Sequence, residues 1–538
     1  MAEKGESAVV PDVTVLVVGA GPTGLLLGAE LKRRGVDSLV IDAHEAPMTW
    51  DRATVVHPRS IEVFDHLGIA DALLDAGVKQ RFARIHADGA VLGEIDLSLS
   101  GSRYAFNIGV SEEVTEQILT DYLVRLGGAV TRGTRLVDLE PHGDGVVAML
   151  ENGSESKVVR ARWVVGCDGH RSAVRTLAGI AQDGHPIEEP WAVFDATLTD
   201  FPHTFEANYA YLDDIPLILT ALPGQRWRAY VRPSGPDSDL VADASATLAR
   251  YLPAARFVDV ANPVRFQCFT RVAQHYRSGR LLLAGDAAHT CSPIQGHGMN
   301  SGIQDAFNLA WKLALVAQGH CADTLLDSYE AERRPVALRI TASGDEADSA
   351  QMLKSAADRQ ARNAVIRDVL SDPDARHHEA VAEAELDVDY AASPIVVGEA
   401  GSALSPGQRL PDRVPLGMAD GEVLMLDDLV NRTGHTLLLL GGETARVEKV
   451  ASLFQALCAR ADPRLYGASF AATVVNQGAG GTDVAHGVAG LPAEDALRMG
   501  ITGITLLVVR PDGHVGLRAD TGHEAALVSY GLKLGVRR

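Results

Sequence analysis

Three glycines near the start of the chain have the spacing of a phosphate-binding turn. Gly19, Gly21 and Gly24 form the pattern G-x-G-x-x-G. An apolar run at 13–18 precedes them and an amphipathic run at 25–34 follows, which predicts a strand, a turn and a helix. In such a unit the first glycine allows a tight bend, the second lets a pyrophosphate approach the backbone, and the third lets the helix pack on the strand. The helix N-terminus faces the negative phosphates, so this turn is predicted to bind a dinucleotide.

An acid follows at the position where a ribose would lie. A second apolar run, 38–41, ends at Asp42, eighteen residues beyond Gly24. A carboxylate at the end of the second strand can accept hydrogen bonds from ribose hydroxyls. A lone glycine triplet also occurs in ordinary βαβ units, but here strand, turn, helix, strand and acid follow in order. Arg52, in the next loop, is by itself typical of a solvated charge.

A second segment combines an apolar run with an acid and a glycine. The run 163–166 leads to Asp168 and Gly169, and the basic segment after them closes at Arg175. An Asp-Gly pair after a strand is usually only a turn. This segment alone therefore leaves a structural and a functional interpretation open.

A third segment places a loop rich in glycine and proline before a long helix. The apolar run 280–284 is followed by Gly285 and Asp286, and an amphipathic run at 301–318 predicts the helix. The loop between them contains Pro293, Gly296, Gly298, Met299 and Asn300. Such a loop at a helix N-terminus exposes backbone N–H groups to an anion. Asp286, at the end of a strand, could reach a hydroxyl of a sugar-alcohol chain.

Composition limits the kind of partner that the protein has. A length of 538 residues suggests two to four domains, and a net charge of −21 disfavours nucleic acid and anionic membranes, which would repel the chain. Five cysteines lie far apart without a C-x-x-C pair, which favours buried thiols in a reducing compartment over disulfides or a metal site. No secretory signal and no apolar run of eighteen residues is recognisable, so we expect a cytoplasmic protein without a membrane span.

The predicted fold is α/β, with three domains. Residues 1–182 and 279–393 form a discontinuous, Rossmann-like nucleotide-binding domain. Short alternating runs over 183–278, separated by Pro, Gly and Asp, predict an inserted, mostly antiparallel β-sheet. A Gly-, Ser- and Pro-rich linker at 394–411 precedes a module at 412–538, whose strands and helices follow in a thioredoxin-like order. This module has no cysteine pair, so we expect a structural role.

In this order, the three motifs resemble those of single-component FAD-dependent aromatic hydroxylases, the class A flavoprotein monooxygenases. The chain resembles the phenol hydroxylase and aromatic polyketide hydroxylase branch with a C-terminal thioredoxin-like domain, and its tail 509–520, VRPDGHVGLRAD, is similar to the end of that domain. The resemblance spans nearly the whole chain and implies non-covalent FAD, with NADPH or NADH as co-substrate. The residues that it implies in cofactor binding are Gly19, Gly21, Gly24, Asp42, Arg52, Asp168, Gly169, Arg175, Gly285, Asp286, Pro293, Gly296, Gly298, Met299 and Asn300.

Two residues depart from the family pattern. Glu112 stands near where the family often has a glutamine that contacts the cofactor, and Gln295 replaces the first glycine of a Pro-x-Gly-Gly-x-Gly loop. We expect flavin binding to be retained, whereas the resemblance does not fix the path of the loop.

The resemblance also implies a reaction. NAD(P)H reduces FAD, O2 then forms a flavin hydroperoxide, and its distal oxygen is transferred to a phenolic ring. A base or hydrogen-bond acceptor beside the substrate oxygen would favour the reactive phenolate. The candidates for the substrate pocket are Tyr209, Tyr211, Thr220 and Tyr230, and no catalytic residue is assigned. The strand at 217–222 has no arginine that could hold a carboxylate, and Arg228 would do so only if it faced inward, so we expect a substrate without an essential carboxylate.

Other classes of protein share parts of this pattern. The main alternative is an aromatic polyketide-tailoring oxygenase, acting by hydroxylation or by Baeyer–Villiger ring insertion. A flavin-dependent halogenase would be expected to contain Trp-x-Trp-x-Ile-Pro, which the sequence lacks. A non-catalytic FAD-binding interaction protein would not need the segment around Asp168. The expected partners are a small aromatic substrate and O2, without nucleic acid or membrane, and a homodimer stays open.

Overall fold

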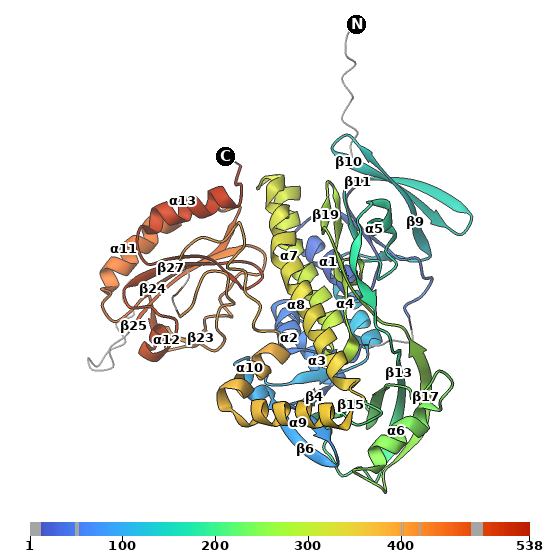
Figure 1. Cartoon of the computed structure of the whole chain (residues 1–538). Helices are drawn as coiled ribbons and strands as arrows, with labels where there is room; N and C mark the ends of the chain where they lie inside the picture. The colour runs from blue at the N-terminus through green and yellow to red at the C-terminus, as the bar shows by residue number, and fades with distance from the viewer. Residues whose placement is uncertain are drawn as a thin grey trace. The chain divides into compact units, whose positions relative to one another are not determined.

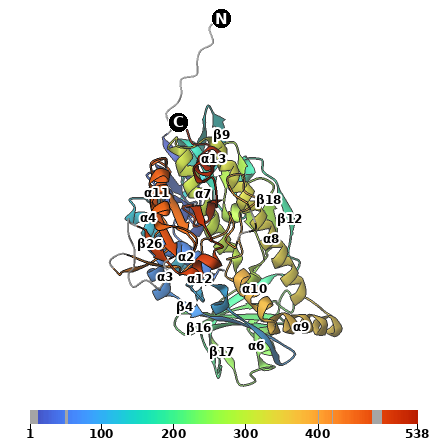
Figure 2. The same ribbon diagram turned by 90° about the vertical axis from the view of Figure 1, so that its left-hand side faces the viewer.

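The chain forms two compact α/β units. The computed structural model describes residues 12–48, 53–399, 401, 403–418, 421–474 and 488–537. Unit 1 consists of residues 1–32, 37–306 and 334–387, and unit 2 of residues 33–36, 307–333 and 388–538. Figures 1 and 2 label the elements of both units in two views. No helix in the described part of the chain is long and apolar enough to cross a membrane.

The first sheet of unit 1 is built around a buried, β-branched strand. β1 (Val13–Val18) pairs in parallel with β2 (Ser38–Ile41) on one side and β11 (Glu155–Gly166) on the other. β8 (Val130–Thr131) and β20 (Leu281–Leu283) extend the sheet in parallel beyond β2 and β11. Helix α1 (Pro22–Arg33) connects β1 with β2. Because these strands run in parallel, their carboxyl ends meet at one edge of the sheet.

The second sheet of unit 1 has seven strands in the order β17-β13-β16-β15-β14-β5-β6. They are β17 (Arg256–Phe266), β13 (Trp191–Thr199), β16 (Arg226–Val231), β15 (Leu217–Leu222), β14 (Ala207–Tyr211), β5 (Phe82–Ala87) and β6 (Ala90–Asp96). Neighbouring strands are antiparallel except β14 and β5, which pair in parallel. Helix α6 (Leu240–Ala249) covers one face (Figure 1). The sequence placed this sheet within 183–278, whereas the structure adds residues 82–96 to it.

Smaller elements complete unit 1. One three-stranded sheet contains β3 (Val55–Val56), β7 (Asn107–Gly109) and β4 (Val78–Gln80), and another contains β12 (Gln182–Pro186), β18 (Phe269–Ala273) and β21 (His289–Thr290). The hairpin of β9 (Thr134–His142) and β10 (Gly145–Asn152) pairs with β11, and β19 (Arg277–Ser278) pairs with β20. The helices are α2 (Pro58–His66), α3 (Ala70–Ala76), α4 (Glu112–Arg125), α5 (Ala173–Leu177), α9 (Ala356–Ser371) and α10 (Pro373–Glu383). Two long helices, α7 (His297–Ala317) and α8 (Asp327–Gln351), contribute residues to both units.

Unit 2 contains a mixed sheet in the order β23-β22-β26-β25-β24-β27-β28. Its strands are β23 (Val423–Met425), β22 (Pro415–Gly417), β26 (Ala489–Leu491), β25 (Tyr466–Val474), β24 (His435–Gly441), β27 (Ile504–Val509) and β28 (Val515–Ala519). Helices α11 (Val447–Cys458) and α13 (His523–Lys533) lie side by side, and α12 (Ala493–Arg498) follows β26 in the chain. β24 is buried along its whole length, which explains its continuous apolar run.

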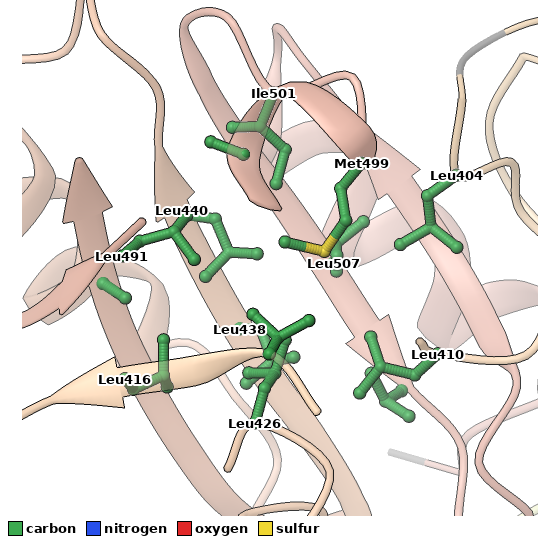
Figure 3. Packing of buried hydrophobic residues seen from close by; sticks show 14 of the residues in the cluster. Leu404, Leu410, Leu416, Leu426, Leu438, Leu440, Leu491, Met499, Ile501 and Leu507 are labelled. Atoms are coloured by element: carbon green, nitrogen blue, oxygen red, sulfur yellow. The ribbon is translucent and has the colours of Figure 1, made fainter. Parts of the chain in front are cut away.

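The core of unit 2 includes part of the segment predicted to be a linker. Leu404 and Leu410 belong to the same buried cluster as Leu438 and Leu507 (Figure 3). Arg409, in the same segment, forms a β-bridge with His514. Its apolar residues follow no helical or strand period, so the sequence could not distinguish packed irregular chain from a linker.

A buried ionic cluster of four residues lies in unit 2: Lys312, Glu332, Arg510 and Asp512. Arg510 donates to both carboxylate oxygens of Glu332 at 2.8 Å each, and Lys312 donates to Glu332 at 2.7 Å. Asp512 pairs with Arg510 and accepts from the indole N–H of Trp311 at 2.9 Å. Burial opposes ionisation of Glu332, but the charges of Arg510 and Lys312 outweigh it and lower the pKa of this carboxyl to about 2. The cluster joins α7, α8 and the turn after β27.

A buried histidine lies near this cluster. Neither ring nitrogen of His435, on β24, has a hydrogen-bond partner in the described part of the chain. The rings of Trp311, Tyr466 and Tyr530 lie around it at centroid distances of 5.3, 6.0 and 5.7 Å. Burial, aided by the charge of Arg510, lowers the pKa of His435 to about 3.

The buried ring of His435 should make the free energy of unfolding fall in mild acid. Below a pH of about 6.5 the unfolded histidine takes up a proton. The folded residue stays neutral down to about pH 3, so each pH unit in this window costs about 1.4 kcal/mol. In urea titrations between about pH 7 and 5, His435→Phe should lose less stability than the unsubstituted protein. His142→Phe, at the exposed end of β9, is the control and should keep the original slope. Equal slopes for all three proteins would contradict the prediction.

Candidate functional site

The three sequence motifs meet at the carboxyl edge of the parallel sheet in unit 1. The backbone N–H of Ala284 donates to the carbonyl of Gly166 at 2.9 Å, and that of Cys167 donates to Val18 at 2.7 Å. Gly19 donates in turn to Ile41 at 2.8 Å. The turns after β20, β11, β1 and β2 therefore lie next to one another in one row.

The three glycines of the turn after β1 differ in the space around them, since two are tightly packed and one is open. Gly19 has φ +103°, and a Cβ there would lie 2.6 Å from the carbonyl carbon of Cys167. A Cβ on Gly24 would lie 3.0 Å from the carbonyl carbon of Gly19. A Cβ on Gly21 would instead meet only Glu116, at 3.8 Å. The first and third glycines thus serve packing, and the second leaves the room that a pyrophosphate needs.

Asp42 lies beside this turn, and its carboxylate already accepts hydrogen bonds from the protein. One carboxylate oxygen accepts from the backbone N–H of Ala20 at 2.8 Å, and the other accepts from that of His44 at 2.8 Å. Oδ1 also contacts Nδ1 of His44 at 2.9 Å, so Oδ2 is the oxygen whose second lone pair could accept from a ribose hydroxyl. Arg52, the next predicted contact, lies outside the described residues.

The Asp168 segment is held together by its own hydrogen bonds. The carboxylate accepts from the Ser172 hydroxyl at 2.5 Å and from the Ala173 N–H at 2.7 Å, which places it at the start of α5. Burial raises the pKa of Asp168, and these hydrogen bonds oppose the rise. Arg175 donates to the carbonyls of Ala287 and His170, both at 2.9 Å, and so connects this segment with the Gly285 segment. Asp168 and Arg175 therefore shape the edge, while Gly169, with φ +75°, faces open space.

A buried acid that the sequence did not single out supports the Gly285 turn. Asp305, on α7, accepts from the N–H of Gly285 at 3.0 Å and contacts Nε2 of His289 at 2.8 Å. Gly285 has φ +61°, and a Cβ there would lie 2.6 Å from the Thr23 hydroxyl on α1. Asp286 is the second residue of a short 3-10 turn, η2 (Gly285–Ala287), and is exposed. The one available signal for Asp305 was that it is the single acidic residue in the sequence of α7.

The loop before α7 and the first turn of that helix contain the predicted glycines and an unexpected anchor. It contains η3 (Pro293–Gln295) and Gly296, which has φ +71°. A Cβ on Gly298 would meet only the Cys291 sulfur, at 3.9 Å, and Met299 is half-buried. Asn300 is buried, and its amide nitrogen donates to the carbonyls of Gly296 at 2.8 Å and Val55 at 2.9 Å. Asn300 thus binds the protein backbone in this structure.

The seven-stranded sheet separates the four substrate candidates onto two faces. Tyr209 and Tyr211 belong to the buried cluster under α6, and Tyr209 donates to the carbonyl of Thr204. Residues of the opposite face form another cluster, which includes Tyr230 and contacts the glycine loop through Ile294. Thr220 is on this second face, because the residues on either side of it in β15 belong to the α6 cluster. Tyr209 and Tyr211 therefore lie on the face that α6 covers, and Thr220 and Tyr230 lie on the opposite face.

Charged side chains of the second face are engaged with acids. Arg228 makes two hydrogen bonds to Asp195, at 2.7 and 2.9 Å. Arg232 pairs with Asp348, and its guanidinium lies 3.9 Å from the centre of the Trp191 ring. Because both arginines are buried, separating either one from its acid would cost free energy. The face is therefore suited to an aromatic ring better than to a carboxylate.

Comparisons with known proteins give further information. The family model described as FAD binding domain matches residues 12–343. The chain is 38% identical over 353 residues to the 6-methylpretetramide 4-monooxygenase of Streptomyces rimosus, covering 64% of this chain and 63% of that protein, which is less than two thirds of its length. Among solved structures it is similar to the OxyS anhydrotetracycline hydroxylase of Streptomyces rimosus, with a TM-score of 0.73, 28% identity, and 97% and 99% of the two chains covered. It is also similar to aklavinone-11 hydroxylase in a ternary complex with FAD and aklavinone, with a TM-score of 0.73, 26% identity, and 98% and 100% covered.

Proposed function

The chain belongs to the FAD-binding domain family of flavin-dependent aromatic monooxygenases, and on that premise we propose that it hydroxylates a phenolic ring with NADPH or NADH and O2. The observation that carries the proposal is the contact of the glycine loop with an apolar face of the seven-stranded sheet, through Ile294. When bound, FAD supplies the redox chemistry, accepting a hydride from the nicotinamide and activating O2 toward an electron-rich ring. The protein has to bind the cofactor, orient the ring and exclude water.

Three groups of residues would hold FAD along the carboxyl edge of the parallel sheet. The open side of Gly21 and the N-terminus of α1 suit the pyrophosphate, and Asp42 suits a ribose. Asp286 is exposed at the end of β20 and suits a hydroxyl of the sugar-alcohol chain. Backbone N–H groups at the start of α7, near Gly298 and Met299, suit the polar edge of the flavin ring. These assignments rest on open space and on donors that a bound anion would satisfy.

We propose that the substrate ring lies on the second face of the seven-stranded sheet. The buried cluster on this face contains the rings of Trp191 and Tyr230, and its half-buried members Ile218 and Phe266 supply apolar surface. The Tyr230 hydroxyl lies 2.9 Å from the Thr54 hydroxyl, so this pair can pass a hydrogen bond to a phenol oxygen. Thr220 is a second polar group on the same face. The pairing of Arg228 and Arg232 with acids supports a substrate without an essential carboxylate.

A polycyclic aromatic substrate is the more specific version of this proposal. The names of two similar proteins refer to polyketide-type molecules, 6-methylpretetramide and aklavinone. The same residues would suit Baeyer–Villiger insertion into a ring of that kind, which we keep as the alternative reaction. A rigid, apolar ring system would bury more surface on the second face of the seven-stranded sheet than a single phenol would. It would therefore bind the protein more tightly.

We also propose a fold type for the parallel sheet of unit 1 and for the C-terminal module. The parallel order β20-β11-β1-β2, with a glycine turn before α1, supports a Rossmann-like fold for the cofactor region. The order of strands and helices from β24 to α13 supports a thioredoxin-like fold for the C-terminal module. Cys458 is the only cysteine of that module, so a structural role is the better proposal.

A panel of mono- and polycyclic phenols tests the reaction. We expect the purified protein to be yellow, to oxidise NADPH or NADH faster with a suitable phenol, and to give a product heavier by one oxygen atom. Labelling with ¹⁸O2 should place that atom in the product. Coenzyme oxidation that yields only peroxide with every phenol would contradict hydroxylation, and a ring-expanded lactone would favour the Baeyer–Villiger alternative.

A further inference from the structure

The ring of His57 lies directly behind the glycine loop of unit 1. His57 is fully buried and immediately precedes α2. A Cβ added to Gly296 would lie 3.3 Å from its Nε2 atom. The loop residue with the left-handed backbone is therefore packed against this imidazole, and any movement of the ring would move the loop.

Both ring nitrogens of His57 face hydrogen-bond acceptors. Nε2 lies 3.0 Å from the backbone carbonyl of Gln295, which can only accept. Nδ1 lies 3.2 Å from the side-chain oxygen of Asn107 on β7. The amide nitrogen of Asn107 donates to Glu383 at 3.3 Å, which turns its oxygen toward His57. Both ring nitrogens are therefore placed to donate, and the Glu383 carboxylate lies 3.9 Å from Nδ1.

A second hydrogen-bond set joins the same two segments. The backbone N–H of His57 donates to the side-chain oxygen of Asn300 at 3.0 Å. The amide of Asn300 donates to the carbonyls of Gly296 and Val55. Two consecutive loop carbonyls, those of Gln295 and Gly296, are thus held by His57 and Asn300. We refer to His57 and Asn300 together as the loop clamp.

His297, the first residue of α7, fixes the other end of the loop. Its Nδ1 donates to Glu385 at 2.8 Å, and Gln304 donates to the second oxygen of that carboxylate. Burial disfavours the charged ring, but the hydrogen bond and charge of Glu385 outweigh it and raise the pKa of His297. Glu383 and Asp387 act in the same direction, and His57 is the other titratable ring in contact, at a centroid distance of 5.1 Å.

We propose that His57 is a positioning residue, whose two ring N–H groups hold the glycine loop in the conformation that binds the flavin ring. The inference deepens the proposed function, because it rests on FAD binding at this loop. His57 does not need to contact the cofactor, since it acts through the Gln295 carbonyl and the Gly296 backbone.

The same residues resemble a metal site in type but not in bonding. His57, His297 and Glu385 offer ligand atoms within 4.8 Å of one another. A metal ion needs unprotonated ring nitrogens, whereas Nε2 of His57 and Nδ1 of His297 point at a carbonyl and a carboxylate. These contacts favour donated hydrogen bonds over metal ligation.

Three substitutions of His57 separate the two hydrogen bonds. The amide of glutamine can replace the donor toward Gln295, that of asparagine can replace the donor toward Asn107, and phenylalanine replaces neither. We expect His57→Gln to stay within about threefold of the original FAD dissociation constant, and His57→Asn and His57→Phe to weaken it about tenfold or more. His142→Gln, at the exposed end of β9, is the matched control. Circular dichroism and unfolding of the apoprotein show whether each variant is folded.

Equal FAD affinity of the folded Phe and Gln variants would overturn the inference, because then only the volume of the ring would matter. Retained affinity of His57→Asn with a loss in His57→Gln would overturn the assignment of the Gln295 contact. Absence of FAD binding by the unsubstituted protein would instead contradict the proposed function. If the His57 variants do not fold, Asn107→Leu tests the same hydrogen-bond set, because leucine is similar in size but cannot accept from Nδ1 of His57. We expect it to weaken FAD binding several-fold, and an affinity equal to that of the unsubstituted protein would overturn the inference.

The pH dependence of FAD affinity gives a second readout. Because the pKa of His297 is raised, its pairing with Glu385 is complete below the ordinary histidine pKa of about 6.5 and is lost as pH rises through the higher, folded value. FAD binding should therefore weaken with rising pH above neutrality, and His297→Gln should flatten this profile. A profile of the same shape in His297→Gln would contradict the role of the loop anchor.

Discussion

Replacing Arg510 by methionine is expected to lower the free energy of unfolding of the protein by about 3–5 kcal/mol. Methionine removes the cation that pairs with both Glu332 and Asp512, and it leaves two buried carboxylates, of which Glu332 keeps Lys312 as a partner. An uncompensated buried charge costs far more than the pair contributed when intact. Urea or thermal unfolding of the purified variant measures the loss.

The control for this prediction is another arginine pair in the same unit. Arg464 pairs with Asp462 at 2.6 Å, but both side chains are accessible to solvent. Arg464→Met should change stability little, because exposed pairs are screened by water and salt. A double variant, Arg510→Met with Glu332→Gln, should lose less than the sum of the two single changes. Equal effects of Arg510→Met and Arg464→Met would show that the ionic cluster does not stabilise the fold.

Two glycines of the first motif should respond differently to alanine. Gly21→Ala is expected to leave the stability of the apoprotein unchanged and to weaken FAD binding about tenfold or more, because its methyl group fills the space left for the pyrophosphate. Gly24→Ala is expected to destabilise the apoprotein itself, by about 1–3 kcal/mol, because its Cβ overlaps the backbone at Gly19.

Apoprotein unfolding and FAD titration, carried out on the same preparations, separate the two effects. Gly169→Ala is not a suitable control, because its positive φ would add backbone strain. Gly503→Ala is suitable, since its Cβ would meet nothing within 4 Å and it lies in unit 2. Normal FAD affinity in Gly21→Ala would argue against a pyrophosphate at this turn.

Motifs of short range could be predicted from the sequence because their parts lie next to one another in the chain. The strand at 13–18, the turn at Gly19 and the helix after it occur as expected, since the glycine spacing and the apolar period specify them locally. The sequence could not show that the Asp168 carboxylate would accept a hydrogen bond from the first residue of α5. A carboxylate after a strand can bind a ligand or the next helix, and only the path of the chain decides between them.

Contacts between distant residues were beyond sequence reasoning. Tyr209 and Tyr211 were correctly placed on one face of a strand by their alternation, but the period of two does not say which face α6 covers. The loop clamp joins His57 to Asn300, and His57 also contacts Asn107, residues that no local pattern connects. Nothing in the immediate surroundings of His57 in the sequence distinguishes it from an ordinary buried histidine.

The parallel pairing of β5 with β14 has a consequence for protein synthesis and for engineering. The hairpin of residues 82–96 leaves the ribosome more than a hundred residues before its partner strand at 207–211. One edge of β5 is therefore unpaired until β14 has been synthesised. Exposed strand edges of this kind attract other chains, which makes the interval a point of aggregation risk during expression. Chimeras that exchange the seven-stranded sheet between relatives should therefore transfer residues 82–96 together with 183–278. Transfer of 183–278 alone would pair a foreign β14 with the resident β5.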